Sequence, residues 1–298
     1  LALPPFQKWP QQNGWTFLTW FRIESNQINS QPYLYYFRTS KSGVGYSAHF
    51  TGNCLVLTSM KIKGKGFQHC IPYEFQSQKW YHCAITYLTK WRSAEMKVYV
   101  NGQLTANTEM AWQVQTNDHF DKCFIGGTPD LNDTYLFSGQ IASIYLFNEA
   151  LNPSQICSIH RLGPSYIGQF RHSNESQMEL PAGIRRVLYE EKLSSSIFCL
   201  YTPVAVESDT LCLQCLPKNN CSYFISSPHA ALIGQAKSIQ THSISSTLQS
   251  IGGISALLPL LYKFAQKNDS DACSTLIGFT CDLLEFSPQW FGNEMIQS

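Results

Sequence analysis

The sequence is short of charge. Charged residues make up 14% of its 298 residues, and 21 Lys and Arg against 20 Asp and Glu give a formal net charge of +1. A typical soluble domain has about 25% charged residues. A dedicated nucleic-acid-binding protein usually has a clear basic excess, so the composition argues against that class. We expect part of the surface to be covered by other protein, and the chain to be a piece of a larger one.

Long apolar runs are also missing. A membrane-spanning helix needs about 20 continuous apolar residues. The best run, Ile251 to Leu261, is shorter and is interrupted by Gly252, Gly253 and Pro259. The first nine residues lack the basic start and apolar core of a signal peptide. We therefore expect a soluble segment without a membrane span.

The cysteines do not form a paired framework. There are 11 of them, an odd number, and several lie within apolar runs, such as Cys83, Cys123 and Cys199. A free cysteine in such a run behaves as a small buried hydrophobic residue. Four Asn-X-Ser/Thr triplets carry little weight in a chain rich in Ser and Asn. The pattern favours a reduced, cytosolic protein over a secreted one.

What the sequence does contain is a series of short aromatic and β-branched segments bounded by turn residues. Asn101-Gly102 is its strongest hairpin signal. These segments lack helical periodicity between them, which predicts an antiparallel sandwich over residues 1–164. The expected strands are Trp15–Ile23, Tyr33–Thr39, Gly45–Phe50, Cys54–Lys61, Gly66–Ile71, Trp80–Leu88, Ala94–Val100, Gln103–Thr108, Lys122–Gly126 and Phe137–Phe147.

The pattern changes after the sandwich. Asn152-Pro153 predicts the start of a short helix that Gly163-Pro164 ends. Residues 165–228 are rich in Ser, Pro and Asn and are expected to form an extended connector, with isolated strand-like pieces such as Ser196–Tyr201. Residues 229–298 have helical periodicity, broken at Gly252-Gly253, and predict a truncated armadillo-like α-solenoid.

Several strings resemble the neurobeachin-type BEACH proteins over nearly the whole chain. They include YLYYFRTSKSGVGYSAHFTGNC (33–54), SGQIASIYLFNEALNPSQI (138–156), VLYEEKLSSSI (187–197) and THSISSTLQSIGGI (241–254). The resemblance implies a concanavalin A-like jelly roll set among armadillo-type helices. It also implies a large cytosolic scaffold of vesicle trafficking, peripherally associated with Golgi and endosomal membranes. The family's pleckstrin-like, BEACH and WD40 domains and its kinase-anchoring helix lie outside these residues.

The residues offer little for catalysis. Glycoside hydrolysis needs two carboxylates about 5–5.5 Å apart in retaining enzymes, whereas the acids on the expected strands are solitary. Asn117, Asp118, Asp121, Asp130 and Asp133 are the only candidate calcium ligands, and loop acids more often cap turns or face water. Cys212, Cys215 and Cys221 with His229 lack a second close pair for zinc. Cys83 lacks a cationic setting, and His82 beside it should point to the other face of the strand. We expect no catalytic residue, no metal and no cofactor.

Two sets of residues are candidate binding groups. Lys61, Lys63 and Lys65 alternate, so a continuous strand would project them from one face as an anion-binding patch; alternatively they protect an edge strand from pairing. Trp91 and Trp112 are candidates for a sugar platform or a protein contact.

Together these features predict a non-catalytic interaction module of a trafficking scaffold. Its expected partners are other proteins and the remaining domains of the parent chain, without nucleic acid. Two alternatives stay open: a carbohydrate-binding lectin domain, and anionic membrane-surface binding through the lysines.

Overall fold

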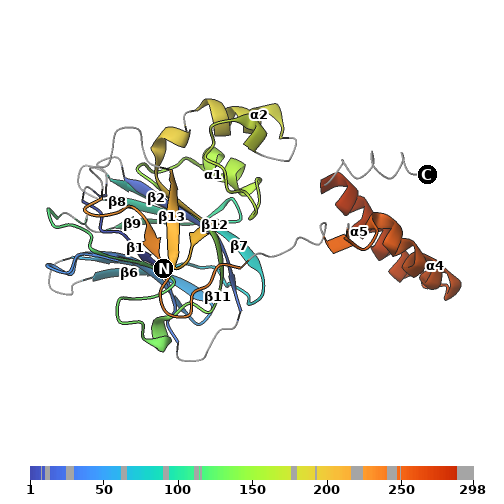
Figure 1. Ribbon diagram of the computed structural model, residues 1–298, viewed down its shortest axis with the longest axis horizontal. Helices are drawn as coiled ribbons and strands as arrows, with labels where there is room; N and C mark the ends of the chain where they lie inside the picture. Colours follow the sequence, from blue (N-terminus) through green and yellow to red (C-terminus); the bar gives the residue numbers. More distant parts are fainter. Residues whose placement is uncertain are drawn as a thin grey trace. The chain divides into compact units, whose positions relative to one another are not determined.

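In the computed structural model of the chain, the aromatic and β-branched segments form strands of one antiparallel fold (Figure 1). The structure describes residues 1–7, 9–10, 14–24, 30–61, 66–89, 94–110, 114, 116–175, 180–191, 193–215, 224–239, 247–248 and 250–286.

All ten expected segments are strands, and their ends differ from the predicted ones by at most two residues. The described strands are β1 (Ala2–Leu3), β2 (Trp15–Ile23), β3 (Tyr33–Arg38), β4 (Gly45–Thr51), β5 (Cys54–Met60), β6 (Gly66–Cys70), β7 (Trp80–Thr89), β8 (Ala94–Val100), β9 (Gln103–Met110), β10 (Lys122–Ile125), β11 (Gly139–Phe147), β12 (Ile197–Glu207), β13 (Thr210–Cys215) and β14 (Ala230–Ala231).

The strands form two facing layers. Their hydrogen-bonded order is β6-β5-β4-β3-β10-β1-β14-β13-β12-β11-β2-β7-β8-β9. The two halves of this order face each other, because rings from β2 pack against rings from β3 and β4. The Phe17 and Tyr35 ring centroids lie 4.9 Å apart, and those of Phe21 and Phe50 lie 5.5 Å apart. The high aromatic content of the sequence therefore fills the core of a sandwich, and the expected fold class is confirmed.

One outer face of the sandwich is covered by the chain itself. Helix α1 (Pro153–His160) and the adjoining α2 (Ala182–Arg185) and π-helical turn η4 (Arg186–Glu190) lie over it (Figure 1). A second apolar cluster joins Leu18 of β2 and Tyr99 of β8 to Ile156 and Ile159 of α1 and Leu188 of η4. Two short 3-10 turns, η3 (Ser173–Glu175) and η5 (Leu193–Ser196), adjoin this layer, and a third, η2 (Asp133–Tyr135), lies beside β3.

Helix α1 starts and stops where its sequence signals lie. The Asn152 side chain accepts a hydrogen bond from the Gln155 backbone N–H at 2.9 Å, and Gln155 Oε1 accepts from the Asn152 N–H at 3.0 Å. This reciprocal capping box satisfies two backbone donors that a helix start leaves unpaired. Past the helix, Gly163 has φ +76°, which ends it.

Residues 165–228, expected to be an extended connector, contribute strands to the sandwich. β12 pairs with both β11 and β13 and therefore lies inside the sheet. Six consecutive residues of β12, from Ile197 to Thr202, are buried. The compact unit accordingly extends from Leu1 to Ser238. A strand buried on both faces reads as a continuous apolar run, which is why one strand-like piece is visible in this polar stretch.

The second unit, Ile239–Ser298, contains η7 (Gly253–Leu257), α4 (Leu258–Gln266) and α5 (Ser270–Phe286). Gly252 and Gly253 have φ of +110° and +70°, so the predicted break lies where expected. The helix expected from His229 is wrong over its described part. Ala230 and Ala231 instead form β14, which pairs with β1 and β13, and residues 232–239 are not helical.

Candidate functional site

The outer face of the other half of the sandwich, formed by β6, β5, β4, β3 and β10, carries the strongest candidate site. Alternation sets which side chains point outward: Tyr46, Ala48 and Phe50 of β4 enter the core, so Ser47 and His49 between them face out. The strand register then places the outward residues of the other strands beside them. We call this surface the Arg38 face; it comprises Tyr33, Tyr36, Arg38, Ser47, His49, Val56, Thr58, Met60, Gln68 and Lys122.

Arg38 is the last residue of β3, and two contacts hold its side chain on this face. Its guanidinium carbon lies 4.7 Å from the centroid of the Tyr36 ring, and its Nη2 donates to Ser47 Oγ at 3.5 Å. Lys122 of β10 is the direct cross-strand partner of Arg38 and is exposed. Among the described residues, no carboxylate lies within ion-pair distance of either cation. Neither cation is therefore held in a salt bridge by a described residue, and the Asp121 carboxylate interacts electrostatically with Lys122.

Aromatic rings line the face next to Arg38. The centroid of the Tyr33 ring lies 5.2 Å from that of His49 and 5.7 Å from those of Tyr36 and of Tyr135, which belongs to η2. Burial raises the pKa of Tyr33, and the charge of Arg38 opposes that rise. Burial first, and then Arg38, lower the pKa of His49, so this ring is neutral near pH 7. The charge of the face thus comes from Arg38 and Lys122.

The floor of the face is polar and buried. Ser47, Thr58 and His49 are only 1%, 5% and 7% exposed. Within the described part of the chain, Thr58 Oγ1, His49 Nδ1 and Arg38 Nε have no hydrogen-bond partner. Buried polar atoms in folded proteins almost always have one, so this concentration of unpaired groups on one face calls for an explanation.

The acids near this face are occupied by partners of their own. Partial burial acts to raise the pKa of Asp121, but hydrogen bonds from the Ser40 backbone and hydroxyl, with Lys122 nearby, outweigh it and lower the pKa. Asp118 forms an ion pair with Lys41 at 3.5 Å. Asp130 accepts from the Thr128 hydroxyl, and Asp133 lies in η2, which Asn132 caps. The acids that the sequence offered as calcium ligands therefore take part in turn and loop contacts.

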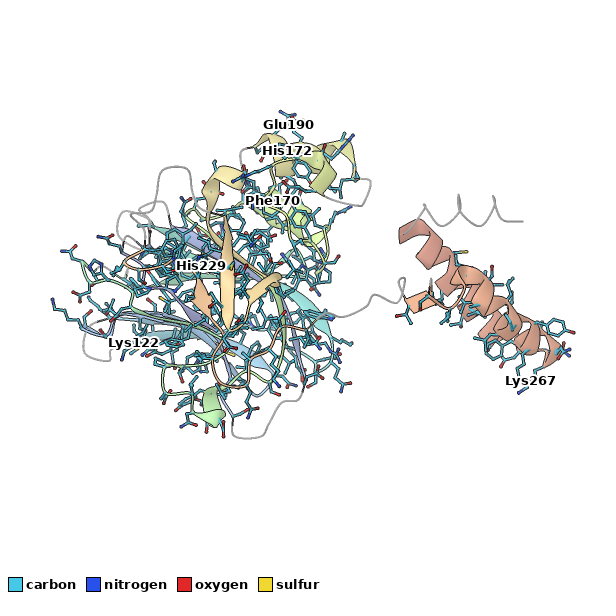
Figure 2. All side chains as sticks on the ribbon, in the orientation of Figure 1. Lys122, Phe170, His172, Glu190, His229 and Lys267 are labelled. Carbon is cyan, nitrogen blue, oxygen red and sulfur yellow. The ribbon has the colours of Figure 1, made fainter. Side chains whose placement is uncertain are left out.

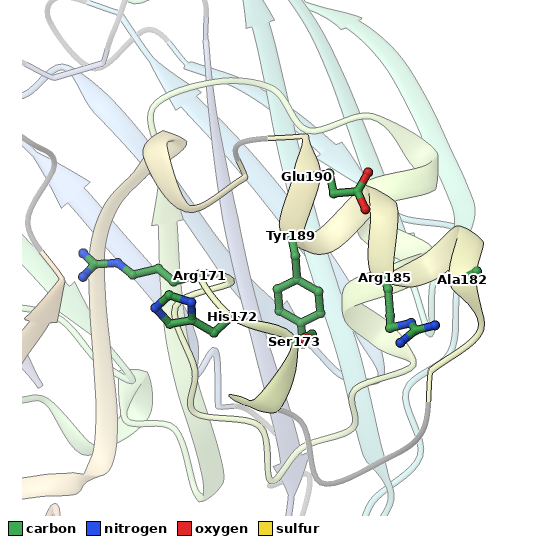
Figure 3. Close-up of a pocket in the computed structure, with 7 residues that line it drawn as sticks. All are labelled: Arg171, His172, Ser173, Ala182, Arg185, Tyr189 and Glu190. Carbon is green, nitrogen blue, oxygen red and sulfur yellow. The ribbon is translucent and has the colours of Figure 1, made fainter.

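A hollow lies where η3 meets α2 and η4, on the covered side of the sandwich (Figure 3). Its volume is about 810 Å³, and its lining residues are Arg171, His172, Ser173, Ala182, Arg185, Tyr189 and Glu190. The Glu175 carboxylate shapes it by accepting from the Tyr166 hydroxyl and from backbone N–H groups, including that of Arg171. Arg171 and Arg185 lie on opposite sides of the Tyr189 ring and Glu190 points away from it (Figure 3), so the charges do not converge on one ligand position.

Of the binding residues predicted from the sequence, only Lys61 lies in the described part of the chain. Lys61 is exposed directly after β5. Lys63, Lys65, Trp91 and Trp112 lie outside the described residues, as does Cys221. His229 Nδ1 accepts a hydrogen bond from the Leu213 N–H at 3.2 Å. Among the described residues, no group of three or more His, Cys, Asp or Glu could hold a metal ion.

Sequence reasoning missed the Arg38 face, although one signal was available. In YLYYFR, Tyr36 and Arg38 are two apart and must share a face of a strand. The contributions of Ser47, Thr58 and Lys122 depend on the strand register, and a β-bulge between Tyr33 and Tyr35 disturbs the alternation in β3 itself.

Two protein-family models match the chain. The model described as the concanavalin A-like lectin/glucanases superfamily matches residues 1–157, and the neurobeachin/BDCP alpha solenoid region matches residues 222–298. In addition, no helix in the described part of the chain is long and apolar enough to cross a membrane.

Curated relatives cover nearly the whole chain. A putative neurobeachin homolog from Caenorhabditis elegans is 41% identical over 96% of this chain, which spans 12% of that relative's length. BEACH domain-containing protein B from Arabidopsis thaliana is 28% identical over 58% of this chain and 7% of its own. Among solved structures, a pentraxin from Limulus polyphemus matches with a TM-score of 0.40 and 16% identity, over 55% of this chain and 74% of that chain.

Proposed function

Because the chain belongs to the neurobeachin-type BEACH protein family of large scaffold-type proteins, we propose that it is a non-catalytic interaction module that presents a jelly-roll surface to protein partners. The observation that carries this proposal is a difference between the two outer faces of the sandwich. The chain covers one with α1, α2 and η4. The Arg38 face combines aromatic rings with cations and buried polar atoms for which the described residues supply no ion-pair or hydrogen-bond partner, apart from the Arg38–Ser47 contact.

The setting we propose is the cytoplasmic side of Golgi and endosomal membranes, where the module would take part in vesicle and membrane-protein trafficking. Its cysteines support a reducing compartment. Cys83, Cys123 and Cys199 are buried in the core, and burial raises the pKa of the Cys83 thiol to about 12. Such thiols act as core packing groups and not as nucleophiles.

The chemistry of the Arg38 face favours protein over sugar. Sites for neutral sugars rely on carboxylate and amide acceptors that fix hydroxyl groups. The five strands under the face contain no Asp, Glu or Asn, Gln68 on β6 is their one side-chain amide, and their outward polar groups include Arg38 and Lys122. This composition suits a ligand that brings its own acceptors.

An affinity experiment with a blocked face tests the proposal. The 298-residue chain is immobilised, and proteins captured from cytosol are quantified by mass spectrometry. Val56 is half-buried on the Arg38 face, so Val56→Glu places a negative charge there. Gln103→Glu adds the same charge on β9 at the opposite end of the strand order and is the matched control.

We expect Val56→Glu to reduce the recovery of specific partners several-fold and Gln103→Glu to leave it unchanged. Recovery that matches an unrelated jelly-roll protein for all three chains would contradict the proposed function. Thermal unfolding of each variant checks that the sandwich is intact.

A further inference from the structure

We propose that the Arg38 face binds an extended acidic segment of a partner protein, with carboxylates of that segment paired with Arg38 and Lys122. This inference deepens the proposed function and depends on it. It names the chemistry of the partner: Asp or Glu side chains next to aromatic or aliphatic ones.

The charge distribution of the sheet is the first argument. β10, β3, β4, β5 and β6 contain two cations, Arg38 and Lys122, and not one Asp or Glu. These cations are direct cross-strand neighbours, so their Cα atoms lie about 5 Å apart. Like charges directly opposite each other destabilise a sheet. A bound carboxylate between them removes that repulsion, so the arrangement is complementary to an anion.

The way Arg38 is held is the second argument. Stacking on Tyr36 and a hydrogen bond to Ser47 fix the plane of the guanidinium. A fixed planar guanidinium matches a carboxylate with two parallel hydrogen bonds, and less side-chain entropy is lost on binding. An arginine that only extends into solvent does not need contacts such as those with Tyr36 and Ser47.

The surroundings of Arg38 favour a polypeptide as the source of the carboxylate. Tyr33 and Tyr36 offer apolar contact area beside the charge, while half-buried Val56 and the exposed amide of Gln68 lie further along the face. An extended segment repeats its side chains on one side about every 6.5–7 Å, so it can contact both regions. A membrane surface is attracted by clusters of several Lys and Arg, and the described strands supply two cations here.

The two cations lie away from the hollow lined by His172 and Glu190. Figure 2 shows Lys122 on a different side of the sandwich from those residues. Exposed Arg161, which follows α1 on the covered side, is therefore a matched control cation.

The test measures binding of fluorescent poly(Glu,Tyr), a random acidic copolymer with aromatic side chains, to the 298-residue chain by anisotropy at two salt concentrations. We expect Arg38→Gln to raise the Kd about tenfold or more, since a charged hydrogen bond is lost. Arg38→Lys should give an intermediate loss because it keeps the charge without the planar fork. Lys122→Gln, at an exposed position, should raise the Kd roughly threefold, and Arg161→Gln should leave it unchanged.

Equal Kd values for Arg38→Gln, Lys122→Gln and Arg161→Gln would overturn the inference, as would an absence of binding. Heparin and phosphatidylserine vesicles serve as sulfated-glycan and membrane probes. Arg38-dependent binding to either of these without binding to poly(Glu,Tyr) would also overturn it. Because Lys122 is exposed, its variant keeps the test valid even if Arg38→Gln unfolds.

Failure of this inference and failure of the proposed function have different signatures. If Val56→Glu abolishes capture of cytosolic partners while poly(Glu,Tyr) does not bind, the face is an interaction surface for a different chemistry. If capture itself is nonspecific, the proposed function fails regardless of the copolymer result.

Discussion

A buried histidine shows most directly how single residues join α1 to the sandwich. His82 of β7 is fully buried. The centroid of its ring lies 5.2 Å from that of Trp20 and 5.4 Å from that of His160 at the end of α1. His160 in turn stacks on Trp20 at an interplanar angle of 20°. Protonation of the His82 ring is unfavourable, because the ring is buried and neither of its nitrogens has a hydrogen-bond partner in the described residues.

This contact predicts a loss of stability in mild acid. Burial, with a smaller contribution from His160, lowers the pKa of His82 from 6.5 to about 3. The unfolded chain therefore takes up a proton between these values while the folded chain does not, and the free energy of unfolding falls as the pH drops below 6.5. Each pH unit corresponds to about 1.4 kcal/mol, so His82 accounts for a loss on the order of 2 kcal/mol by pH 5.

Urea unfolding of the wild-type chain and of His82→Phe at pH 7.5 and pH 5 checks this prediction. The phenyl ring keeps the aromatic contacts but cannot be protonated, so the variant should lose less stability between the two pH values. His160 has a lowered pKa as well and leaves a residual dependence. Exposed His172, changed to Gln, is the control and should behave as wild type. An unchanged pH dependence in His82→Phe would rule out this role.

At the scale of single elements, α1 links local sequence to stability. Its capping box forms entirely from the side chains and backbone of Asn152 and Gln155. Replacing Asn152 by Ala removes an acceptor from the helix start and should lower the free energy of unfolding by about 1 kcal/mol. Asn152→Asp keeps an acceptor and should retain most of the stability. Chemical denaturation of both variants measures the free energy of unfolding. Equal losses in the two variants would show that the side-chain cap does not cause the loss of stability.

Elements of this kind are also the ones that sequence predicts well. The cap at Asn152, the turn at Asn101-Gly102 and the break at Gly252-Gly253 depend on backbone conformations and hydrogen bonds within a few residues. Both turn residues of Asn101-Gly102 have positive φ, as a tight hairpin requires. Local rules therefore give these features directly.

Features made by strand pairing over long distances are different. β14 is only two residues long and exists because Ala231 pairs with Ala2 of β1 and with Thr210 of β13, which no local pattern reveals. The Arg38 face depends likewise on the pairing of Lys122 with Arg38 and of Ser47 with Tyr36 and Thr58. The predicted site residues instead came from visible local patterns, such as alternating lysines, and only Lys61 among them lies in the described part.

At the scale of the whole molecule, the division of the chain into units differs from a reading based on composition. Composition places a boundary near residue 164, where polar residues begin. In the structure, β12 lies between β11 and β13, and both apolar clusters draw on it: Phe198 and Tyr201 belong to one and Ile197 and Leu200 to the other. One strand thus packs on the sandwich core with one face and on the α1 layer with the other.

The last prediction concerns where this unit can be cut. A fragment of residues 1–164 lacks β12, β13 and η4 and leaves Tyr145 and Phe147 of β11, both buried in the intact chain, without their neighbours. Each large side chain exposed in this way costs about 1.5–3 kcal/mol. For these two residues the cost is about 3–6 kcal/mol, a large part of the usual total stability of about 5–15 kcal/mol. We therefore expect residues 1–238 to give a soluble fragment with cooperative thermal unfolding, and residues 1–164 to aggregate or bind a dye for exposed apolar surface. A cooperative transition of equal midpoint in the shorter fragment would show that the sandwich closes without β12.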